Sequence, residues 1–434
     1  MPPPTSTSPS TATPDFSYTV RVDAAPGGLP QAFMDMLQHT QAAMVRVGGE
    51  HGKLKAQMDL LKAENMQLRR EADALRQALS KAQTGQTGGD AAGIIPGMGA
   101  PQAEGAFQLQ RTIAIHNAPV HSVAMATHDI NNDGQLKNKV VATASWDATI
   151  KLYDLERMEL VKTFGDVEAG VEGKMQGLYA VAWAKTAPEI LGCTCCDHNV
   201  YLWDHTSGKL LKKLPGHSDE VNGIDFHPSQ QVMCTASDDC KVIIWDFHEG
   251  IKLRMLDKHT KQVYGTTFLG QEMQYNVATC CFDRQTRIFD MRDKTVVALL
   301  KEHTDDVIGI DYSGSKQLLA TGSDDGIIAL WDTRTWKLQD RINTKADPSM
   351  AENEVKRVAF SSCGNLLAAA CSSGYVLVYD ITGNTSNLAP LAQLGGHTDC
   401  VFDVTWGLDA AGHKTLVSAS HDHTCRYWRS TNLI

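Results

Sequence analysis

The sequence predicts a mainly β protein, a seven-bladed β-propeller preceded by an α-helical coiled coil. A twelve-residue pattern recurs seven times after residue 140, and leucines recur every seven residues before residue 80. A pattern that recurs many times along the chain is typical of propellers, and leucines at every seventh residue are typical of coiled coils. Composition divides the chain into a Pro/Ser/Thr-rich tail that we expect to be disordered, a helix with a coiled coil, a flexible Gly/Ala-rich linker and the propeller, at residues 1–28, 29–82, 83–106 and 107–434.

The first unit of the repeat is TASWDATIKLYD, residues 143–154. The other six are CTCCDHNVYLWD, TASDDCKVIIWD, TCCFDRQTRIFD, TGSDDGIIALWD, AACSSGYVLVYD and SASHDHTCRYWR. The units end at Asp154, Asp204, Asp246, Asp290, Asp332, Asp380 and Arg429, which gives spacings of 50, 42, 44, 42, 48 and 49 residues. Short β-branched runs between polar turns predict strands, and repeats of this length with four strands each close into a propeller. Seven units therefore predict seven blades.

A second pattern lies upstream of each unit: an aliphatic residue, another aliphatic or small residue three positions later, and an aromatic residue two further on, as in Val221-Ile224-Phe226. In five units a histidine stands four residues before the first aliphatic position. Together these patterns resemble the WD-repeat family over residues 107–429. The resemblance implies that each repeat supplies the outer strand of one blade and three inner strands of the next. The last repeat stops at Arg429, so we expect Phe107 to Ile115 to complete its blade and close the ring.

Histidine, serine and aspartate recur in the blades, and these are the residue types of a hydrolase triad. Evenly repeated copies are not expected of an active site, and the resemblance implies a structural hydrogen-bond network instead, so we expect no catalytic residues. Its predicted members are His217, Ser237, Asp239, Trp245, His303, Ser323, Asp325, Trp331, His397, Ser420, Asp422 and Trp428. Blades 2 and 6 lack the histidine, so we expect packing to hold them, with looser connections at residues 165–173 and 343–354.

Two further motifs suggest metal sites. DINNDG at residues 129–134 matches half of a calcium-binding loop, but Val140 occupies the position of the bidentate glutamate. The cysteines of CTCCDH and Cys280-Cys281 fall on separate blades, where other blades carry small residues. We expect a hairpin turn and buried thiols, with no metal and no cofactor.

Bulk properties narrow the partners and the compartment. A net charge of −10 argues against direct binding of nucleic acid, and no apolar run approaches the roughly 20 residues of a membrane span. The N-terminal residues lack the pattern of a secretory signal. Eleven cysteines without framework spacing indicate reduced thiols. The sequence therefore predicts a cytoplasmic or nuclear protein whose partners are proteins or peptides.

The heptad predicts a parallel homodimer. Leucines occupy one seam position, and Asn65 stands among apolar residues at the other, where an asparagine favours a two-stranded parallel coil. The seam residues are Leu54, Met58, Leu61, Asn65, Leu68, Leu75 and Leu79. A single helix packed on the propeller is the alternative. Residues 29–50 either extend the dimer or bind another protein, and the sequence leaves both readings open.

The residue before each turn aspartate lies, by the resemblance, on the top face of the propeller, as do residues flanking the first aliphatic position. Aromatic residues at such positions are typical of binding hot spots. Together with acidic neighbours they fit a peptide or helix with apolar anchors and Lys or Arg. The predicted partner-binding residues are Trp146, Tyr179, Tyr264, Phe282, Phe402, His421, Glu220, Asp238, Asp306 and Asp324. The alternative is that some of these rings fold inward over the central channel.

These features favour a non-enzymatic dimeric scaffold that assembles a multiprotein complex on the propeller. Two alternatives remain within the binding class. FDMR and WDTR, with Arg292 and Arg334, resemble the motif by which some WD-repeat proteins dock onto cullin-RING ubiquitin ligase adaptors. The order of coiled coil, linker and seven blades resembles an autophagy-type scaffold.

Overall fold

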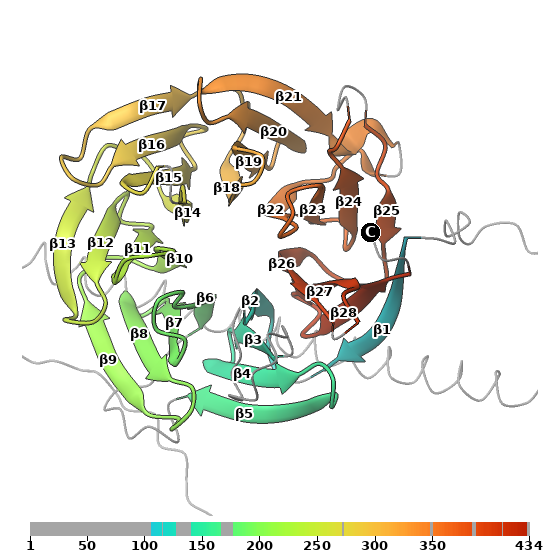
Figure 1. The fold of residues 1–434 in the computed structure, drawn as a ribbon, viewed down its shortest axis with the longest axis horizontal. Coiled ribbons are helices and arrows are strands. Elements are labelled where there is room, and N and C mark those ends of the chain that lie inside the picture. Colours follow the sequence, from blue (N-terminus) through green and yellow to red (C-terminus); the bar gives the residue numbers. More distant parts are fainter. Residues whose placement is uncertain are drawn as a thin grey trace, which may run out of the picture. The chain divides into compact units, whose positions relative to one another are not determined.

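The computed structural model describes residues 106–431, apart from residues 115, 127–139, 166–176, 271–272, 348–349, 384–387 and 410. Within this part of the chain, 28 strands form seven four-stranded antiparallel sheets around a central axis (Figure 1). The predicted mainly β fold with seven blades is confirmed. The tail, the helix and coiled coil, the linker up to residue 105 and the DINNDG segment lie outside the described residues, so their predictions stay predictions.

Each blade runs from an innermost strand at the central axis to an outermost strand at the rim. Blades 1 and 2 consist of β2 (Val120–Met125), β3 (Val140–Ser145), β4 (Thr149–Asp154) and β5 (Glu159–Gly165), then β6 (Leu178–Trp183), β7 (Ile190–Cys195), β8 (Asn199–Asp204) and β9 (Leu210–Pro215). Blades 3 and 4 consist of β10 (Val221–Phe226), β11 (Val232–Ser237), β12 (Val242–Asp246) and β13 (Ile251–Leu256), then β14 (Val263–Phe268), β15 (Asn276–Cys281), β16 (Thr286–Asp290) and β17 (Val296–Leu300).

The remaining blades follow the same order. Blades 5 and 6 consist of β18 (Val307–Ser313), β19 (Leu318–Ser323), β20 (Ile327–Asp332) and β21 (Lys337–Asn343), then, after a short 3-10 helix η1 (Thr344–Ala346), β22 (Val355–Phe360), β23 (Leu366–Cys371), β24 (Val376–Asp380) and β25 (Ala392–Leu394). Blade 7 consists of β26 (Val401–Leu408), β27 (Lys414–Ser420), β28 (Cys425–Ser430) and β1 (Phe107–Ile113).

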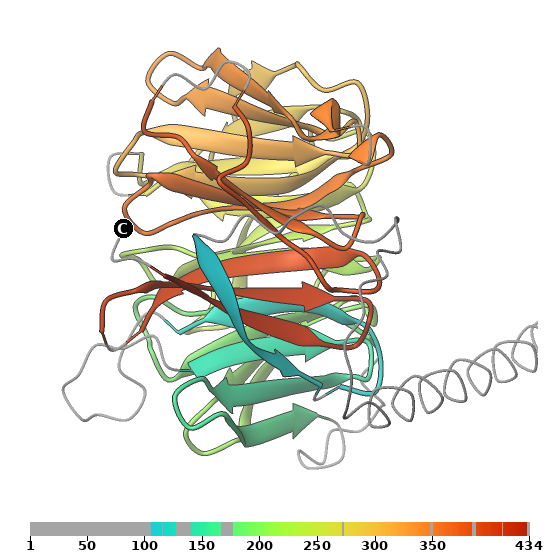
Figure 2. The ribbon, with the colours of Figure 1, turned by 90° about the vertical axis from the view of Figure 1, so that its right-hand side faces the viewer.

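The first and last described strands close the ring, as expected. β1 pairs with β28 antiparallel, from Phe107 opposite Ser430 to Ile113 opposite Cys425. Seen from the side in Figure 2, the blue-green closing strand lies against the red strands of blade 7. Ile113 is buried in a cluster with residues of blades 1 and 7. The N-terminal strand therefore ties the end of the propeller to its beginning.

Neighbouring blades cover both faces of each sheet, so the second strand of a blade, for example β3, β7 or β19, is buried at every residue. At the axis the backbones come close together. A Cβ at Gly223 in β10 would lie 2.7 Å from the carbonyl oxygen of Tyr264 in β14. Glycine is required there because the inner strands converge.

A chain of hydrogen bonds connects the core of blade 3 to the turn between its second and third strands. The Nε1–H of Trp245 donates to Thr235 Oγ1 at 2.9 Å, and this hydroxyl lies 2.8 Å from His217 Nε2. Nδ1 of His217 donates to Asp239 Oδ2 at 2.9 Å. Because the carboxylate only accepts, Nδ1 carries the proton and Nε2 accepts from the threonine. Each member of this chain thus has its partner.

The same arrangement recurs in blades 5 and 7, through Thr321 and Ser418 respectively, and blade 1 has the His116, Thr143 and Asp147 part of it. The predicted serine takes a different place. Ser237 Oγ donates to the carbonyl of Asp219 and accepts from the backbone N–H of Asp239. The residue that touches the histidine is the threonine, or serine, two positions earlier, which the sequence prediction missed.

Blades 2 and 6, which we expect to be held mainly by packing, also have polar networks at their turns. In blade 2, Tyr201 on β8 donates its hydroxyl to Asp197 at 2.5 Å, which replaces the missing histidine. In blade 6, buried Asn353 donates to Thr344 Oγ1 at 3.0 Å and accepts from the backbone N–H of Ser373. Different residue types therefore stabilise the same turn.

Basic side chains at one position of the outermost strand link blades 1 to 4. Each donates to a backbone carbonyl in the turn between the third and fourth strands of the following blade. The pairs are Lys162 to Thr206 at 2.9 Å, Lys212 to Glu249 at 3.1 Å and Arg254 to Arg292 at 3.4 Å. These bonds supplement the apolar contacts between the blades.

Replacing Thr235 by valine tests the polar chain. The change leaves two buried groups, Trp245 Nε1–H and His217 Nε2, without their partner, so we expect the unfolding free energy to fall by roughly 2–4 kcal/mol. Urea denaturation measures it. Thr398→Val is the matched control, because this residue is exposed. Equal stability of the two variants would contradict the role of Thr235.

The buried histidines predict how stability depends on pH. Burial lowers the pKa of His116 and His259 below the usual 6.5, so below about pH 6.5 the unfolded chain binds more protons than the folded one. The unfolding free energy therefore falls as the pH decreases from there. Burial opposes ionisation of Asp325, but the hydrogen bond with His303, the charge of His303 and two backbone hydrogen bonds together hold the pKa at about 2, so this contribution is lost only below about pH 4. Constant urea midpoints from pH 7 to 5 would contradict this.

Candidate functional site

The turns between the second and third strands of the blades fix one residue each on the face of the ring that we call the upper face. In each turn the backbone N–H of this residue donates to a carbonyl just before the innermost strand, for example Trp146 to Pro119 and Asp238 to Glu220. The seven residues are Trp146, Cys196, Asp238, Phe282, Asp324, Ser372 and His421. Their backbone positions are therefore set by the blades.

Five rings from blades 1, 2 and 7 pack together on this face, and we call them the aromatic cluster: His121, Trp146, Tyr179, Phe402 and His421. Trp146 stacks on His121 with ring centroids 5.2 Å apart and 11° between the planes, and Phe402 stacks on His421 at 4.0 Å. Tyr179 meets His121 edge-on at 5.0 Å. Trp146 is the exposed member, with 45% of its surface accessible.

Trp146 is exposed on this face, as the sequence predicts, and His121, which the sequence also places here but which is not among the predicted partner-binding residues, stacks against it. His121 comes directly after Val120, the first aliphatic residue of its unit, and that position is the signal by which the sequence places it on this face. Gly177 makes room for the tryptophan, because a Cβ there would lie 3.0 Å from Trp146 Cδ1. The cluster thus depends on residues from three blades.

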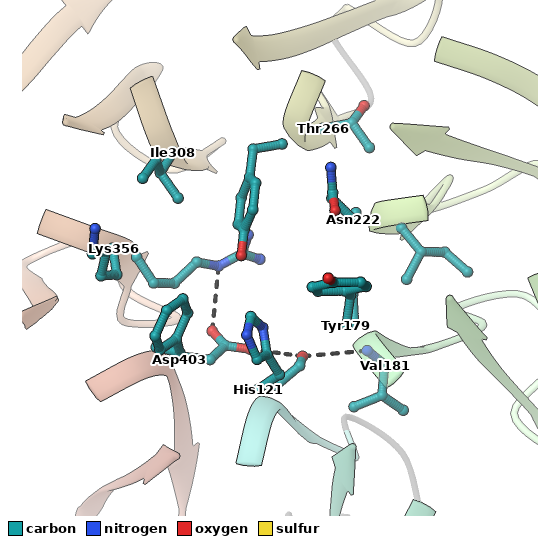
Figure 3. A pocket seen from close by; sticks show the side chains of 15 residues that line it. His121, Tyr179, Val181, Asn222, Thr266, Ile308, Lys356 and Asp403 are labelled. Carbon is teal, nitrogen blue, oxygen red and sulfur yellow. Dashed lines mark hydrogen bonds and ion pairs between the residues drawn. The ribbon is translucent and has the colours of Figure 1, made fainter. Parts of the chain in front are cut away.

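The other predicted aromatics do not form one outer arc. Tyr264 and Phe282 of blade 4 stack as a separate pair, with ring centroids 5.7 Å apart and 12° between the planes. Tyr179, Tyr264 and Phe402 turn toward the axis and line the cavity at the mouth of the central channel, which Figure 3 shows with His121 and Tyr179 labelled. These three rings therefore follow the alternative in which some of the predicted aromatic side chains fold inward over the central channel.

The cavity is small, about 40 Å³, and Arg357 is one of the residues that line it. Its Nε lies 3.3 Å from Asp403 Oδ1, and Asp403 Oδ2 accepts from Ser122 Oγ at 2.8 Å (Figure 3). Four blades have alanine or glycine at the position of Arg357, namely Ala180, Gly223, Gly265 and Gly309. A space of this size holds one or a few water molecules.

The four predicted acidic residues have different surroundings. Glu220 accepts a hydrogen bond from the Tyr179 hydroxyl at 2.5 Å, and Asp238 accepts one from Asn222 at 2.6 Å. Asp324 pairs with Lys356 at 2.8 Å. Burial raises the pKa of Asp238, although the Asn222 bond opposes this, and neighbouring carboxylates raise it further.

Burial raises the pKa of Asp306 as well, and the positive charge of Lys261 offsets this only in part. A cation brought near Asp238 and Asp306 would stabilise both carboxylates.

Both histidines of the aromatic cluster are neutral at neutral pH. Burial lowers the pKa of His121 to about 3, and it also lowers that of His421, which nearby Asp399 opposes. Nε2 of His421 is buried and has no hydrogen-bond partner in the described part of the chain. The cluster is thus uncharged but contains one buried polar atom without a hydrogen-bond partner among the described residues.

Among the described residues, one group of potential metal ligands lies close together: His259, Cys281 and Asp283 of blade 4. Arg287 occupies this site. Its guanidinium lies 2.7 Å from His259 Nδ1 and 2.6 Å from Asp283 Oδ2. Burial raises the pKa of Cys281 well above neutrality, so the thiol stays protonated. The guanidinium of Arg287 therefore supplies the positive charge among these potential ligands.

Arg287 also gives His259 of blade 4 the tautomer opposite to that of His217 in blade 3. Arginine only donates, so Nδ1 of His259 must accept and Nε2 must carry the proton, which it donates to Thr279 Oγ1 at 2.7 Å. The threonine is free to accept because Phe289 stands where blade 3 has a tryptophan. This blade therefore satisfies the same positions with the opposite tautomer.

The opposite side of the ring, the lower face, carries the turns between third and fourth strands, where Arg292 and Arg334 lie. Each arginine forms a fork with the aspartate two residues earlier: Arg292 with Asp290 at 2.6 Å and Arg334 with Asp332 at 3.0 Å. Their side chains are 62% and 68% exposed. The guanidinium of Arg292 also lies over the Tyr275 ring at 4.3 Å. The forks orient both groups without covering them.

Comparisons with known proteins agree with the fold. The family model "WD domain, G-beta repeat" matches residues 107–154 and 208–246, and "Nucleolar protein 10-like, N-terminal domain" matches residues 305–432. The human WD repeat-containing protein 37 is 25% identical over 270 residues, which are 60% of this chain and 50% of that protein. The Xenopus laevis Denticleless protein homolog B is 22% identical over 303 residues, 67% of this chain and 40% of that protein.

A shorter match is closer in sequence: the pre-mRNA-splicing factor cwf17 of Schizosaccharomyces pombe is 39% identical over 72 residues, 17% of this chain and 21% of that protein. The chain spans about half the length of the curated relatives of the WD repeat-containing protein 37 type. None of the helices in the described part of the chain is long and apolar enough to cross a membrane.

Proposed function

We propose that this chain, a WD-repeat propeller protein by its repeats, fold and relatives, is a non-enzymatic dimeric adaptor that binds protein or peptide partners on its upper face. The observation that carries the proposal is the aromatic cluster, in which Trp146 presents 45% of its surface at a position fixed by the backbone. Aromatic residues on a rigid platform supply much contact area at little entropic cost. The acidic residues beside the cluster favour a partner that carries basic residues.

The repeated polar groups support binding rather than catalysis. The histidine–aspartate pairs of blades 1, 3, 5 and 7 hold turns, and each histidine is engaged on both nitrogens. The hydroxyls that they contact, on Thr143, Thr235, Thr321 and Ser418, are buried, so a substrate would not reach them as nucleophiles. These groups therefore fix the upper face on which the proposed partner binds.

Replacing Trp146 by alanine tests the upper face. Because the tryptophan is half-exposed, we expect the unfolding free energy to change by about 1 kcal/mol or less, whereas partner binding weakens by about 2 kcal/mol or more. Affinity purification with quantitative mass spectrometry measures the loss. Leu299→Ala is the matched control, since this residue is 43% exposed on the rim strand β17. Identical partner sets for Trp146→Ala and wild type would rule out the upper face.

The dimer is proposed from the heptad in residues 54–79. Two propellers on flexible linkers would bind a partner with two sites more tightly than either propeller alone, because the second contact forms at a high effective concentration. A weak single contact at each upper face is then sufficient. This fits a cluster formed by a few rings.

Aspartates in the seam test the dimer. Leu61→Asp with Leu68→Asp buries charge in the predicted seam, so we expect the chain to have the mass of one protomer in light scattering, against two for the wild type. Ala63→Asp with Gln67→Asp adds the same charges outside the predicted seam and should leave the dimer intact. A wild-type chain that sediments as a monomer at micromolar concentration would refute the proposal.

The two arginine forks favour a second candidate, a substrate receptor of a cullin-RING ubiquitin ligase. Arg292 and Arg334 occupy equivalent turns of consecutive blades, and both are oriented by an aspartate yet exposed. Two such groups on one face suit bidentate contacts with an acidic surface of a ligase adaptor. The upper face would then hold the substrate.

Removing both forks tests this candidate. We expect Arg292→Ala with Arg334→Ala to abolish co-purification of a cullin-RING ligase adaptor subunit while the upper-face partners stay bound. Arg157→Ala is the control, because this arginine lies in the lower turn of blade 1 and is 73% exposed. If no ligase subunit co-purifies with the wild type, this second function is excluded.

A further inference from the structure

The aromatic cluster contains a hydrogen-bonding atom that the described chain does not satisfy. Nε2 of His421 is buried and unpaired, although the rest of the residue is well placed: its backbone N–H donates to Cys400, and its ring stacks on Phe402. Buried polar atoms in folded proteins almost always have a partner, because an unpaired one costs on the order of 1–3 kcal/mol. The atom therefore marks a place where a polar group of a ligand fits.

Elsewhere the chain satisfies such a histidine with arginine. Arg287 donates to Nδ1 of His259 at 2.7 Å, and Arg429 lies 2.7 Å from Nδ1 of His413. In both cases an aspartate completes the group: Asp283 lies 2.6 Å from Arg287, and Asp409 lies 2.7 Å from Arg429. Histidine, arginine and aspartate thus form a recurring triplet in this fold.

On the upper face two members of such a triplet are present. The histidine is His421, and the aspartate is Asp399, which is exposed and whose backbone carbonyl accepts a hydrogen bond from Ser420, the residue before His421, at 3.2 Å. The third member, a guanidinium that donates to His421 Nε2, is missing among the described residues. A guanidinium from another molecule would therefore complete this group.

Trp146 supplies the platform for such a group. Guanidinium ions stack on aromatic faces, and within this chain Arg292 lies over Tyr275 at 4.3 Å. Trp146 has its ring parallel to His121 at 5.2 Å, contacts His421 at 5.6 Å between ring centroids and is 45% exposed. An arginine beside His421 would therefore meet the tryptophan as well.

We propose that the aromatic cluster binds an arginine side chain of the partner, whose guanidinium stacks on Trp146, donates a hydrogen bond to His421 Nε2 and pairs with Asp399. This inference rests on the proposed function, since it names the anchor residue of the partner at the same face. Because Nε2 is covered, binding requires a side-chain adjustment among the rings around His421, while the backbone of the turn stays in place. Lysine lacks the planar fork, and an apolar residue lacks the donor.

The test uses the full chain labelled with 5-fluorotryptophan and three capped peptides, acetyl-Gly-Xaa-Gly-amide with Xaa arginine, citrulline or leucine. Citrulline keeps the shape of arginine but not its charge. The Trp146 resonance is assigned by its absence in Trp146→Phe. We expect the arginine peptide to shift this resonance at millimolar concentration and citrulline to bind at least tenfold more weakly.

A variant separates the hydrogen bond from the stacking. His421→Phe keeps a ring against Phe402 but removes the acceptor, and we expect it to weaken the arginine peptide at least tenfold while the other tryptophan resonances stay unchanged. Equal shifts with arginine and citrulline, no shift with arginine, or unaltered affinity in His421→Phe would each overturn the inference.

The result also separates this inference from the proposed function. A shift with the leucine peptide alone would overturn the arginine assignment but leave the upper face as a binding surface. Failure of the proposed function would appear instead as an unchanged partner set after Trp146→Ala.

Discussion

The pairing of β1 with β28 joins the first and last described strands in one sheet, and the positions of all seven blades depend on it. Without β1 the seventh sheet would end at β28, with an unpaired edge next to blade 1. The buried contacts of Ile113 would also be lost, and these include residues of both blades 7 and 1. The aromatic cluster lies at this junction, since its rings come from blades 7, 1 and 2. Ring closure therefore sets the geometry of the candidate site.

The centre of the ring explains why that site is shallow. Inner strands converge so closely that glycine stands at several positions of the channel wall, and blades 6 and 7 instead place Arg357 and Asp403 there as an ion pair. This pair and the rings of Tyr179, Tyr264 and Phe402 line the same small cavity. What the upper face offers a partner is consequently a surface of rings and carboxylates with one prominent tryptophan.

Phased repeats were sufficient to predict the number of blades, the closing strand and the exposure of Trp146, because these follow from strand period and turn position. The direction of the other rings was not predictable from sequence, since side chains from several blades pack together at the mouth of the channel. The contact of His217 with Thr235 rather than Ser237 was missed, because both residues fit the pattern and only the fold brings one of them to the ring. Tyr201 and Arg287 each bind the turn aspartate four residues earlier, a role that was missed because the residue type at this position differs from blade to blade.

Hydrogen–deuterium exchange tests the dependence of the site on ring closure most directly. The comparison is between the full chain and one carrying Ile113→Asp, which places a charge where β1 packs between blades 7 and 1. The account predicts that amides of β26–β28 and of the segment around His121 and Trp146 lose protection, while those of blades 3 to 5 change least. Unchanged protection of β28 and of the aromatic cluster in this variant would contradict it, because the upper face would then be ordered without the closing strand.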